Sequence, residues 1–421
     1  MTEFFGHALI THKLKCAKDD GNCMADPYLK KLADTLVNYS LGEVDFAKAW
    51  KNGQKRLLVT YEPPADELAK LVTEIILEKE GNVFLDITPS WYRHTYHSKA
   101  SDAVLNSKPL AALKKVDHIA ARLFIRSESN TRSMATVGPS RIMMRLAALK
   151  PYKDVIYEVD SKGDFLIPWC VTLFPTEAYA QDMDMPYDEY RDYVWKTMLL
   201  DYDEPAKAWQ TVSEKQDELE RKVLDGCKTF RMVDEEDQTD LFMSVEGHRW
   251  IKSDGKRNFP SDEIFNAPRK DSVEGVVTFP KLPQYYRSGP EVSGIKLKFE
   301  KGEVVEWEAR VGQDYMDNFL TKNVGAKHLG EIAFGLHPRI QRISKQILFD
   351  EKIGGTVHMA FGSAYKLHVL GKGDKSQLND SPIHWDMIRD MRKPSSYVLI
   401  DEKYKLTWDS GTALWTVQES S

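Results

Sequence analysis

The feature that most constrains the fold is an alternation of strand-like and helix-like segments in the first half of the chain. Residues 56–62 (RLLVTYE) form a short apolar run typical of a strand, and residues 65–81 carry apolar side chains at helical spacing up to a glycine. A second strand-like run follows at 82–89 (NVFLDITP). Strand, helix and strand at this spacing predict parallel βαβ units.

The pattern continues through strand-like runs at 118–127 and 165–175 and helical stretches at 186–201 and 204–226. After the acidic run 234–240 (DEEDQTD) the chain changes to short strand-like segments with turn residues between them, at 275–280, 295–311, 356–361, 365–370 and 396–409, with a hairpin tip at Lys301-Gly302. We therefore expect an extension at 1–24, an α/β domain with a largely parallel sheet at 25–235, and a strand-rich α+β domain at 236–421.

Composition and charge exclude several classes of protein. The net charge of −6 argues against nucleic acid as the main partner. The longest apolar stretch, 165–174, is about half the length that crosses a bilayer, and the amino terminus lacks the pattern of a signal peptide. Cys16 and Cys23 lack a second ligand pair for zinc, so the four cysteines are expected to be reduced thiols. These observations predict a cytoplasmic protein without a membrane partner.

The familiar catalytic signatures are absent from the sequence. It contains no H-E-x-x-H, no G-x-S-x-G and no phosphate-binding glycine loop. His94 and His97 have a spacing that would suit ligands on a helix, but no carboxylate stands near them, and we expect surface or packing roles for both. The chemistry must therefore come from a less common arrangement of residues.

His384 and Asp386, in SPIHWDMI, are the first candidates for such an arrangement. They are two residues apart in a strand-like stretch, and a strand directs residues i and i+2 to the same face. Imidazole nitrogen with carboxylate oxygen suits zinc, cobalt or manganese. Taken alone, H-x-D is also compatible with an ordinary surface strand.

Further acidic and histidine residues in apolar surroundings favour a metal site. Glu263 and Glu331 stand inside apolar segments, where an unpaired carboxylate is costly, and Glu351 and His358 flank a Gly354-Gly355 turn that lets the backbone pass close to a neighbour. Cations would offset these charges, and the number of groups suits two ions. Two ions bridged by a carboxylate would activate water and polarise a substrate carbonyl.

These motifs carry a family likeness. NFPSDEIFNAPRKDSVEG, HLGEIAFG, LFDEKIGGTVHMAFGSAY and SPIHWDM, in this order, resemble the motif series of peptidase family M29, whose members are thermophilic metallo-aminopeptidases. Stretches of the first half, such as KLADTLVNYSL and TLFPTEAYAQDMDMPYDEYRDYVW, are similar to the family as well. The resemblance covers nearly the whole chain from about Met24.

The resemblance implies cleavage of amino-terminal residues from peptides by a centre of two divalent ions (Zn, Co, Mn or Mg), and a homodimer. The implied metal ligands are Glu263, Glu331 as the bridge, Glu351, His358, His384 and Asp386. Tyr365 matches the family's active-site tyrosine, and Glu263 or Glu331 would take the proton of the attacking water. The sequence does not decide between these two glutamates.

Three departures from the family pattern stand out. Two additional residues separate Glu351 from His358 compared with some members, Asp262 replaces a glycine, and Arg269 replaces a common histidine. Asp262 and Arg269 are expected to affect substrate preference and remove no ligand. Two alternatives remain open: a dinuclear hydrolase of a phosphate or other ester or amide, which should bring Lys or Arg to the metals, and a catalytically silent metal-binding protein.

Overall fold

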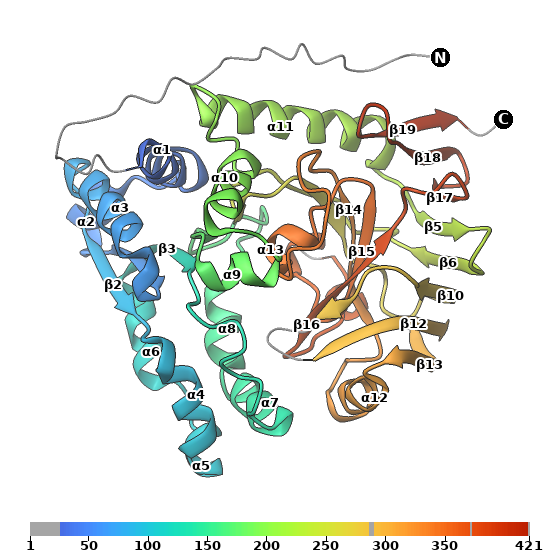
Figure 1. The fold of residues 1–421 in the computed structure, drawn as a ribbon, viewed down its shortest axis with the longest axis horizontal. Coiled ribbons are helices and arrows are strands. Elements are labelled where there is room, and N and C mark those ends of the chain that lie inside the picture. Colours follow the sequence, from blue (N-terminus) through green and yellow to red (C-terminus); the bar gives the residue numbers. More distant parts are fainter. Residues whose placement is uncertain (1–25, 286–289, 371–372, 420–421) are drawn as a thin grey trace.

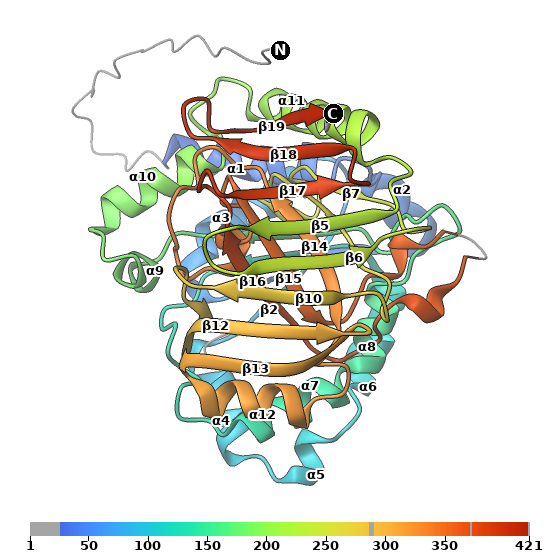
Figure 2. The same cartoon turned by 90° about the vertical axis from the view of Figure 1, so that its right-hand side faces the viewer.

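The computed structural model describes residues 26–285, 290–370 and 373–419 (Figures 1 and 2). It combines an α/β part built from the first half of the chain with two antiparallel sheets built mainly from the second half, so the predicted fold class is confirmed. The predicted extension at 1–24, with Cys16 and Cys23, lies outside the described residues. The domain boundaries stay predictions.

The first sheet has five strands in the order β2-β1-β3-β4-β8, and every neighbouring pair is parallel. These strands are β1 (Arg56–Tyr61), β2 (Val83–Ile87), β3 (Ile119–Arg126), β4 (Trp169–Leu173) and β8 (Asn258–Phe259). Three successive residues of β1, Leu57, Leu58 and Val59, are buried, as expected where both faces of a parallel sheet are covered. Strand β8 comes from the second half of the chain and joins the two parts.

Helices surround this sheet and continue across the top of the molecule in Figure 1. Helix α3 shows why they form: Leu68, Ala69, Val72 and Ile76 make one buried stripe, and Asp66 and Glu67 favour the positive end of the helix dipole. The helices of this half are α1 (Pro27–Thr35), α2 (Phe46–Gly53), α3 (Asp66–Glu78), α4 (Ser90–Lys99), α5 (Asp102–Leu105), α6 (Leu110–Lys115), α7 (Pro139–Ala148), α8 (Lys150–Ile156), α9 (Glu177–Asp182), α10 (Tyr187–Thr197) and α11 (Pro205–Leu219).

The second half forms a large and a small antiparallel sheet. The large sheet has the order β11-β12-β10-β6-β5-β17-β18-β19, with β13 paired to β12. Its strands are β5 (Thr229–Asp234), β6 (Thr239–Ser244), β10 (Glu274–Phe279), β11 (Gln284–Tyr285), β12 (Glu291–Glu300), β13 (Glu303–Val311), β17 (Ser396–Ile400), β18 (Tyr404–Asp409) and β19 (Leu414–Glu419). The predicted hairpin tip at Lys301-Gly302 is confirmed, with positive φ at both residues.

The small sheet has the order β16-β15-β14-β9-β7 and lies behind the large sheet in Figure 2. Its strands are β7 (Ile251–Ser253), β9 (Glu263–Asn266), β14 (Leu329–Gly335), β15 (Thr356–Gly362) and β16 (His384–Asp390), and the half also contains α12 (Gln313–Lys322) and α13 (Ile347–Asp350). In Figure 1 it lies between the α/β part and the large sheet. This central position buries all of β14 and β15.

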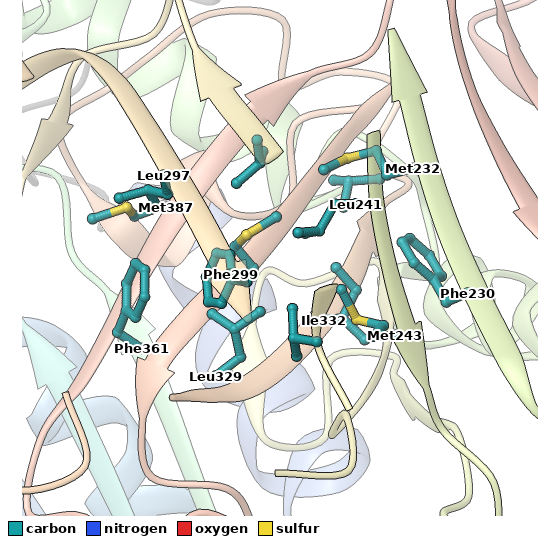
Figure 3. Packing of buried hydrophobic residues seen from close by; sticks show 14 of the residues in the cluster. Phe230, Met232, Leu241, Met243, Leu297, Phe299, Leu329, Ile332, Phe361 and Met387 are labelled. Carbon is teal, nitrogen blue, oxygen red and sulfur yellow. The ribbon is translucent and has the colours of Figure 1, made fainter. Parts of the chain in front are cut away.

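A hydrophobic core fills the space between the two antiparallel sheets. Figure 3 shows Phe230, Met243 and Phe299 of the large sheet packed against side chains of the small sheet such as Ile332 and Phe361. The rings of Phe299 and Phe361 stack at 6.2 Å between their centroids. Burying such side chains stabilises the fold by about 1.5–3 kcal/mol each. Because one face of the small sheet is used for this packing, the opposite face is the one available for functional side chains.

One element differs from the prediction. Residues 365–370 (YKLHVL) read as a strand, but Lys366–His368 form a short 3₁₀ turn, because the chain leaves the sheet after Gly362, whose φ is +102°. Among the described residues, no helix has the length and apolarity required to cross a membrane.

Candidate metal centre

The candidate site lies on the face of the small sheet that points away from the hydrophobic core. Alternation along the strands separates the two sets of side chains. One face enters the core through Ile264, Ile332, Phe334, Val357, Met359, Phe361, Trp385 and Met387. The opposite face carries Glu263, Glu331, His358, His384 and Asp386.

The strand register brings these polar residues together. Glu331 of β14 is opposite Ala360 of β15, and Ala360 is opposite Asp386 of β16, so these three residues form one row across the sheet. Gly335 is opposite Glu263, and Gly362 is opposite His384. The alanine and glycines between the polar residues are small, so this face keeps room for the long carboxylate and imidazole side chains.

His358 lies at the middle of the cluster and is fully buried. Its Nε2 is 3.2 Å from Glu331 Oε1 and 3.4 Å from Glu263 Oε2. Among the described residues, no hydrogen bond reaches Glu263 Oε2 although this oxygen is buried. A bound cation would satisfy this oxygen, since a buried carboxylate oxygen that accepts no hydrogen bond is costly. The residues present therefore fit a metal ion.

His384 and Asp386 occupy the same face of β16, as their spacing predicts. His384 Nε2 is 3.1 Å from Asp386 Oδ1 and 3.9 Å from Glu331 Oε2. The other ring nitrogen, Nδ1, lies 2.8 Å from the carbonyl oxygen of Ser363. A hydrogen bond from Nδ1–H to this carbonyl orients the ring and leaves Nε2 as the ligand atom, the usual arrangement for histidine at a metal.

Glu351 reaches the cluster from the turn after α13 and is accompanied by a residue that the sequence analysis missed. Lys352 has a side chain with no exposed surface, and its Nζ is 2.6 Å from Glu351 Oε1 and forms a second ion pair with Glu263 Oε1. Asn258 Nδ2 donates to Glu351 Oε1 over 3.4 Å. The signal that could have found Lys352 is its position directly after Asp350 and Glu351 and between apolar residues, where a buried lysine needs a carboxylate partner.

Two groups of three residues place their ligand atoms within 4.8 Å of one another. One contains Glu331, His384 and Asp386, and the other contains Glu351, His358 and Asp386. Asp386 belongs to both groups, whereas Glu331 belongs to one and contacts His358 of the other. The structure thus brings all six predicted ligands together. Besides Glu331, which was predicted to bridge the ions, Asp386 also lies between the two groups.

The charges of the cluster shift the pKa values of its members. Burial lowers the pKa of both histidines, but Asp386 beside His384 raises that pKa to about 10, and the hydrogen bond to Glu331 raises that of His358 to about 9. Burial raises the pKa of Glu351 to about 7. Burial also lowers the pKa of Lys352, but Glu263 and Glu351 outweigh it and hold the pKa above its ordinary value. The cluster therefore binds positive charge strongly.

Tyr365 stands beside this cluster in a group of aromatic rings. Its ring centroid is 6.3 Å from that of His384, and Tyr157, Phe165 and Phe265 lie 6.1, 6.4 and 6.2 Å from it. Burial raises the pKa of its hydroxyl well above the ordinary value, so this group keeps its proton at neutral pH and can donate a hydrogen bond. Tyr157 and Phe165 come from the first half of the chain, which therefore contributes one wall of the site.

The remaining residues of interest lie outside the cluster. His94 and His97 are on α4, where His97 Nδ1 contacts the carbonyl of Arg93 at 2.8 Å. Asp262 is buried beside Glu263 with φ at 89°, and Gln216 donates to its Oδ1 over 2.9 Å. Burial raises the pKa of Asp262 to about 7. The Asp262 side chain is thus held by α11.

Comparisons with known proteins point to a family of metallopeptidases. A family model described as thermophilic metalloprotease (M29) matches residues 25–410. Aminopeptidase 2 of Geobacillus stearothermophilus is 31% identical over 249 residues, which are 52% of this chain and 58% of that protein, so this match spans somewhat over half of its relative. Aminopeptidase T of Thermus thermophilus is 27% identical over 392 residues, which are 85% of this chain and 88% of that protein.

A solved structure shows the same fold. Wild-type AmpT from Thermus thermophilus superimposes with a TM-score of 0.70 at 22% identity, covering 94% of this chain and 97% of the other. A metallopeptidase family and relatives named aminopeptidases support a metal-dependent aminopeptidase, and the family implies divalent metal. Because the family model matches nearly all of the described sequence, the chain belongs to the thermophilic metalloprotease family M29.

Proposed function

We propose that this protein is an aminopeptidase that releases amino-terminal residues from peptides with the help of two divalent ions. The observation that carries the proposal is the convergence of four carboxylates and two imidazoles on one face of the small sheet, beside the partly buried ring of Tyr365. The family match and the aminopeptidase relatives support the reaction class. Zinc, cobalt, manganese and magnesium all accept this set of oxygen and nitrogen ligands.

The residues that would hold the ions are Glu263, Glu331, Glu351, His358, His384 and Asp386, with Glu331 proposed as the bridge. When bound, divalent ions supply Lewis acidity toward a carbonyl oxygen and toward water. His384 is kept in the ligand tautomer by the Ser363 carbonyl. The acidic cluster would also attract the free amino group of a peptide, because that group is positively charged.

The chain's own acid–base groups would handle the protons. Either Glu263 or Glu331 takes the proton of the attacking water and returns it to the leaving amine. The Tyr365 hydroxyl would donate a hydrogen bond to the negative oxygen that develops on the scissile carbonyl, a contribution worth about 10²–10³ in rate at comparable sites. Measuring both bound metal and activity in Glu263→Gln and Glu331→Gln would separate a proton acceptor, whose loss spares the metal, from the bridging ligand, whose loss removes it.

An assay of aminoacyl p-nitroanilides tests the proposal. The protein is treated with a chelator and then supplied separately with Zn²⁺, Co²⁺, Mn²⁺ or Mg²⁺. Activity should disappear with the chelator and return with at least one ion, and the same substrate with an acetylated amino group should not be cleaved. Hydrolysis that is indifferent to the chelator, or equal for the acetylated substrate, would rule out a metallo-aminopeptidase.

A hydrolase of phosphate or other esters is the second candidate function, and Lys352 is the observation in its favour. Such an enzyme should bring a cationic side chain to the metals, and Lys352 does lie there. Its ammonium, however, is already paired with two carboxylates, which makes it a poor anchor for a phosphate. Turnover of p-nitrophenyl phosphate or its diesters, without turnover of aminoacyl p-nitroanilides, would favour this candidate.

The proposed setting is a cytoplasmic homodimer. The resemblance supports the dimer, and the buried free thiols of Cys170 and Cys227 are compatible with a reducing compartment. Light scattering coupled to size-exclusion chromatography measures the assembly directly. A monomer at micromolar concentration would contradict the proposal.

A further inference from the structure

Among the described residues, Lys352 is the one lysine or arginine buried among the carboxylates of the metal centre, and its backbone is held from both sides. Its backbone N–H donates to the carbonyl of Phe349 over 2.9 Å, and its carbonyl accepts from the N–H of His337 over 3.0 Å. Its side chain has no exposed surface. The ammonium therefore cannot leave for solvent without rearrangement of the turn after α13.

The contacts of the ammonium are not evenly distributed over the centre. Nζ pairs with Oε1 of Glu351 at 2.6 Å and with Oε1 of Glu263. Glu351 belongs to the ligand group that contains His358 and Asp386. Neither Glu263 nor Glu351 belongs to the other group, which consists of Glu331, His384 and Asp386. The ion position formed by Glu351, His358 and Asp386 therefore has the Lys352 ammonium paired with one of its ligands. In the part of the chain that the structure describes, the position formed by Glu331, His384 and Asp386 has no such ammonium on its ligands.

The chain's charge count agrees with this asymmetry. Four carboxylates face the site, and Lys352 already neutralises one of the four negative charges. Both histidines must be neutral to bind metal, so one divalent ion leaves a single negative charge, and a second divalent ion leaves an excess of one positive charge. Like charges a few ångströms apart repel strongly in a buried site, where water screens them poorly. The second ion must therefore bind against a repulsion that the first does not meet.

We propose that Lys352 is a permanent cation of the centre that makes the two ion positions unequal. The ion held by Glu331, His384 and Asp386 binds tightly. The ion held by Glu351, His358 and Asp386 binds weakly, because it must share Glu351 with the ammonium. This inference rests on the proposed function in assuming two ions, and it adds that the second ion is exchangeable.

Titration of the metal-free protein with Mn²⁺ tests the inference without an activity assay. Free Mn²⁺ is followed by electron paramagnetic resonance and the heat of binding by calorimetry. The wild-type protein should bind one ion at least tenfold more tightly than the second. In Lys352→Met, which keeps the length of the side chain without its charge, the weaker dissociation constant should fall at least tenfold and the tighter one should change less than threefold.

Three further variants control the experiment. Lys352→Arg keeps the charge and should retain the wild-type inequality, whereas Lys352→Gln provides a neutral variant that still donates hydrogen bonds if the methionine variant does not fold. Lys366→Met removes an exposed charge from the turn after Tyr365 and should leave both constants unchanged.

Two equal sites in the wild-type protein would overturn the inference, and so would neutral variants in which both sites weaken, since Lys352 would then only orient its carboxylates. These failures differ from a failure of the proposed function. If no Mn²⁺ binds and no ion restores peptidase activity, the proposed function fails. If two equal ions bind and the peptidase is active, only the inference about Lys352 fails.

Discussion

Replacing Trp385 by alanine is expected to weaken both the fold and the metal centre. Trp385 stands between the two ligands of β16 and points to the opposite face, where it is 1% exposed. Its ring centroid is 4.6 Å from that of Phe319 and 6.0 Å from that of Tyr315, both on α12 and both nearly perpendicular to it. Packing of the indole thus holds β16, the strand that carries His384 and Asp386, against α12.

The expected loss follows from the burial of this side chain. Truncating a buried tryptophan to alanine costs about 3–5 kcal/mol, and edge-to-face pairs add about 0.5–1.5 kcal/mol beyond their buried area. We therefore expect a loss of about 4 kcal/mol in the free energy of unfolding, which raises the unfolding equilibrium constant by about three orders of magnitude. His384 and Asp386 should also bind metal more weakly, because the strand that carries them is held less firmly.

Urea unfolding of the metal-free protein, followed by far-ultraviolet circular dichroism, measures the first effect. Trp91→Ala is the matched control, since this tryptophan is 63% exposed on α4 and should change the free energy by less than about 0.5 kcal/mol. Trp385→Phe should fall between the wild type and the alanine variant. A loss below about 1 kcal/mol for Trp385→Ala would refute the argument that this side chain anchors the ligand strand.

Three further predictions concern the site itself. Glu331→Gln should lose both metal and activity, and two ions per chain in this variant by elemental analysis would contradict the bridging role. Tyr365→Phe should keep its metal and lose about 10²–10³ in kcat, as expected for a donor to the developing oxyanion; unchanged kcat would exclude that role. The pKa values of His358 and His384, about 9 and 10, lie above the ordinary 6.5. The ion pairs of these protonated histidines therefore contribute fully to the free energy of unfolding of the metal-free protein below about pH 6.5, and the contribution is lost as pH rises through 9 and 10. Binding of an ion should release these protons, so the affinity for metal should rise by up to about tenfold per pH unit for each released proton between pH 7 and 9. Calorimetry in buffers of different ionisation enthalpy counts the released protons. An affinity that does not depend on pH would contradict the protonated state of the histidines.

The sequence was sufficient for those parts of the fold and site that depend on local periodicity. The βαβ spacing predicted the parallel sheet, and the two-residue spacing of His384 and Asp386 predicted their common face. These predictions succeed because strand geometry alone decides which side chains share a face. The same rule separates the ligands of β14 and β15 from the core residues that alternate with them.

The sequence was insufficient where a position depends on contacts between distant segments. The stretch 365–370 has the composition of a strand but turns away from the sheet, because Ser363 and Ala364 bond to the carbonyls of Ile383 and Asn379. Lys352 could have been a surface residue, since nothing in its immediate sequence shows that Glu263, 89 residues earlier, would meet it. The pairing of β9 with β14, and the backbone hydrogen bond between His337 after β14 and Lys352, bring these residues together.

The Gly354-Gly355 turn links the fold to the chemistry of the site. Its glycines were expected to let the backbone approach a neighbour, and the neighbour is Trp408 of β18: a Cβ at either glycine would lie within 2.7 Å of this indole. The close contact ties the segment after α13 to the large sheet, and Lys352 lies two residues before it. The large sheet therefore fixes where the ammonium sits, although it contributes no ligand. A buried charge can affect one ion position more than another only if the charge itself is held in place. The packing of Gly354 and Gly355 against Trp408 holds the turn next to Lys352, and so holds its ammonium.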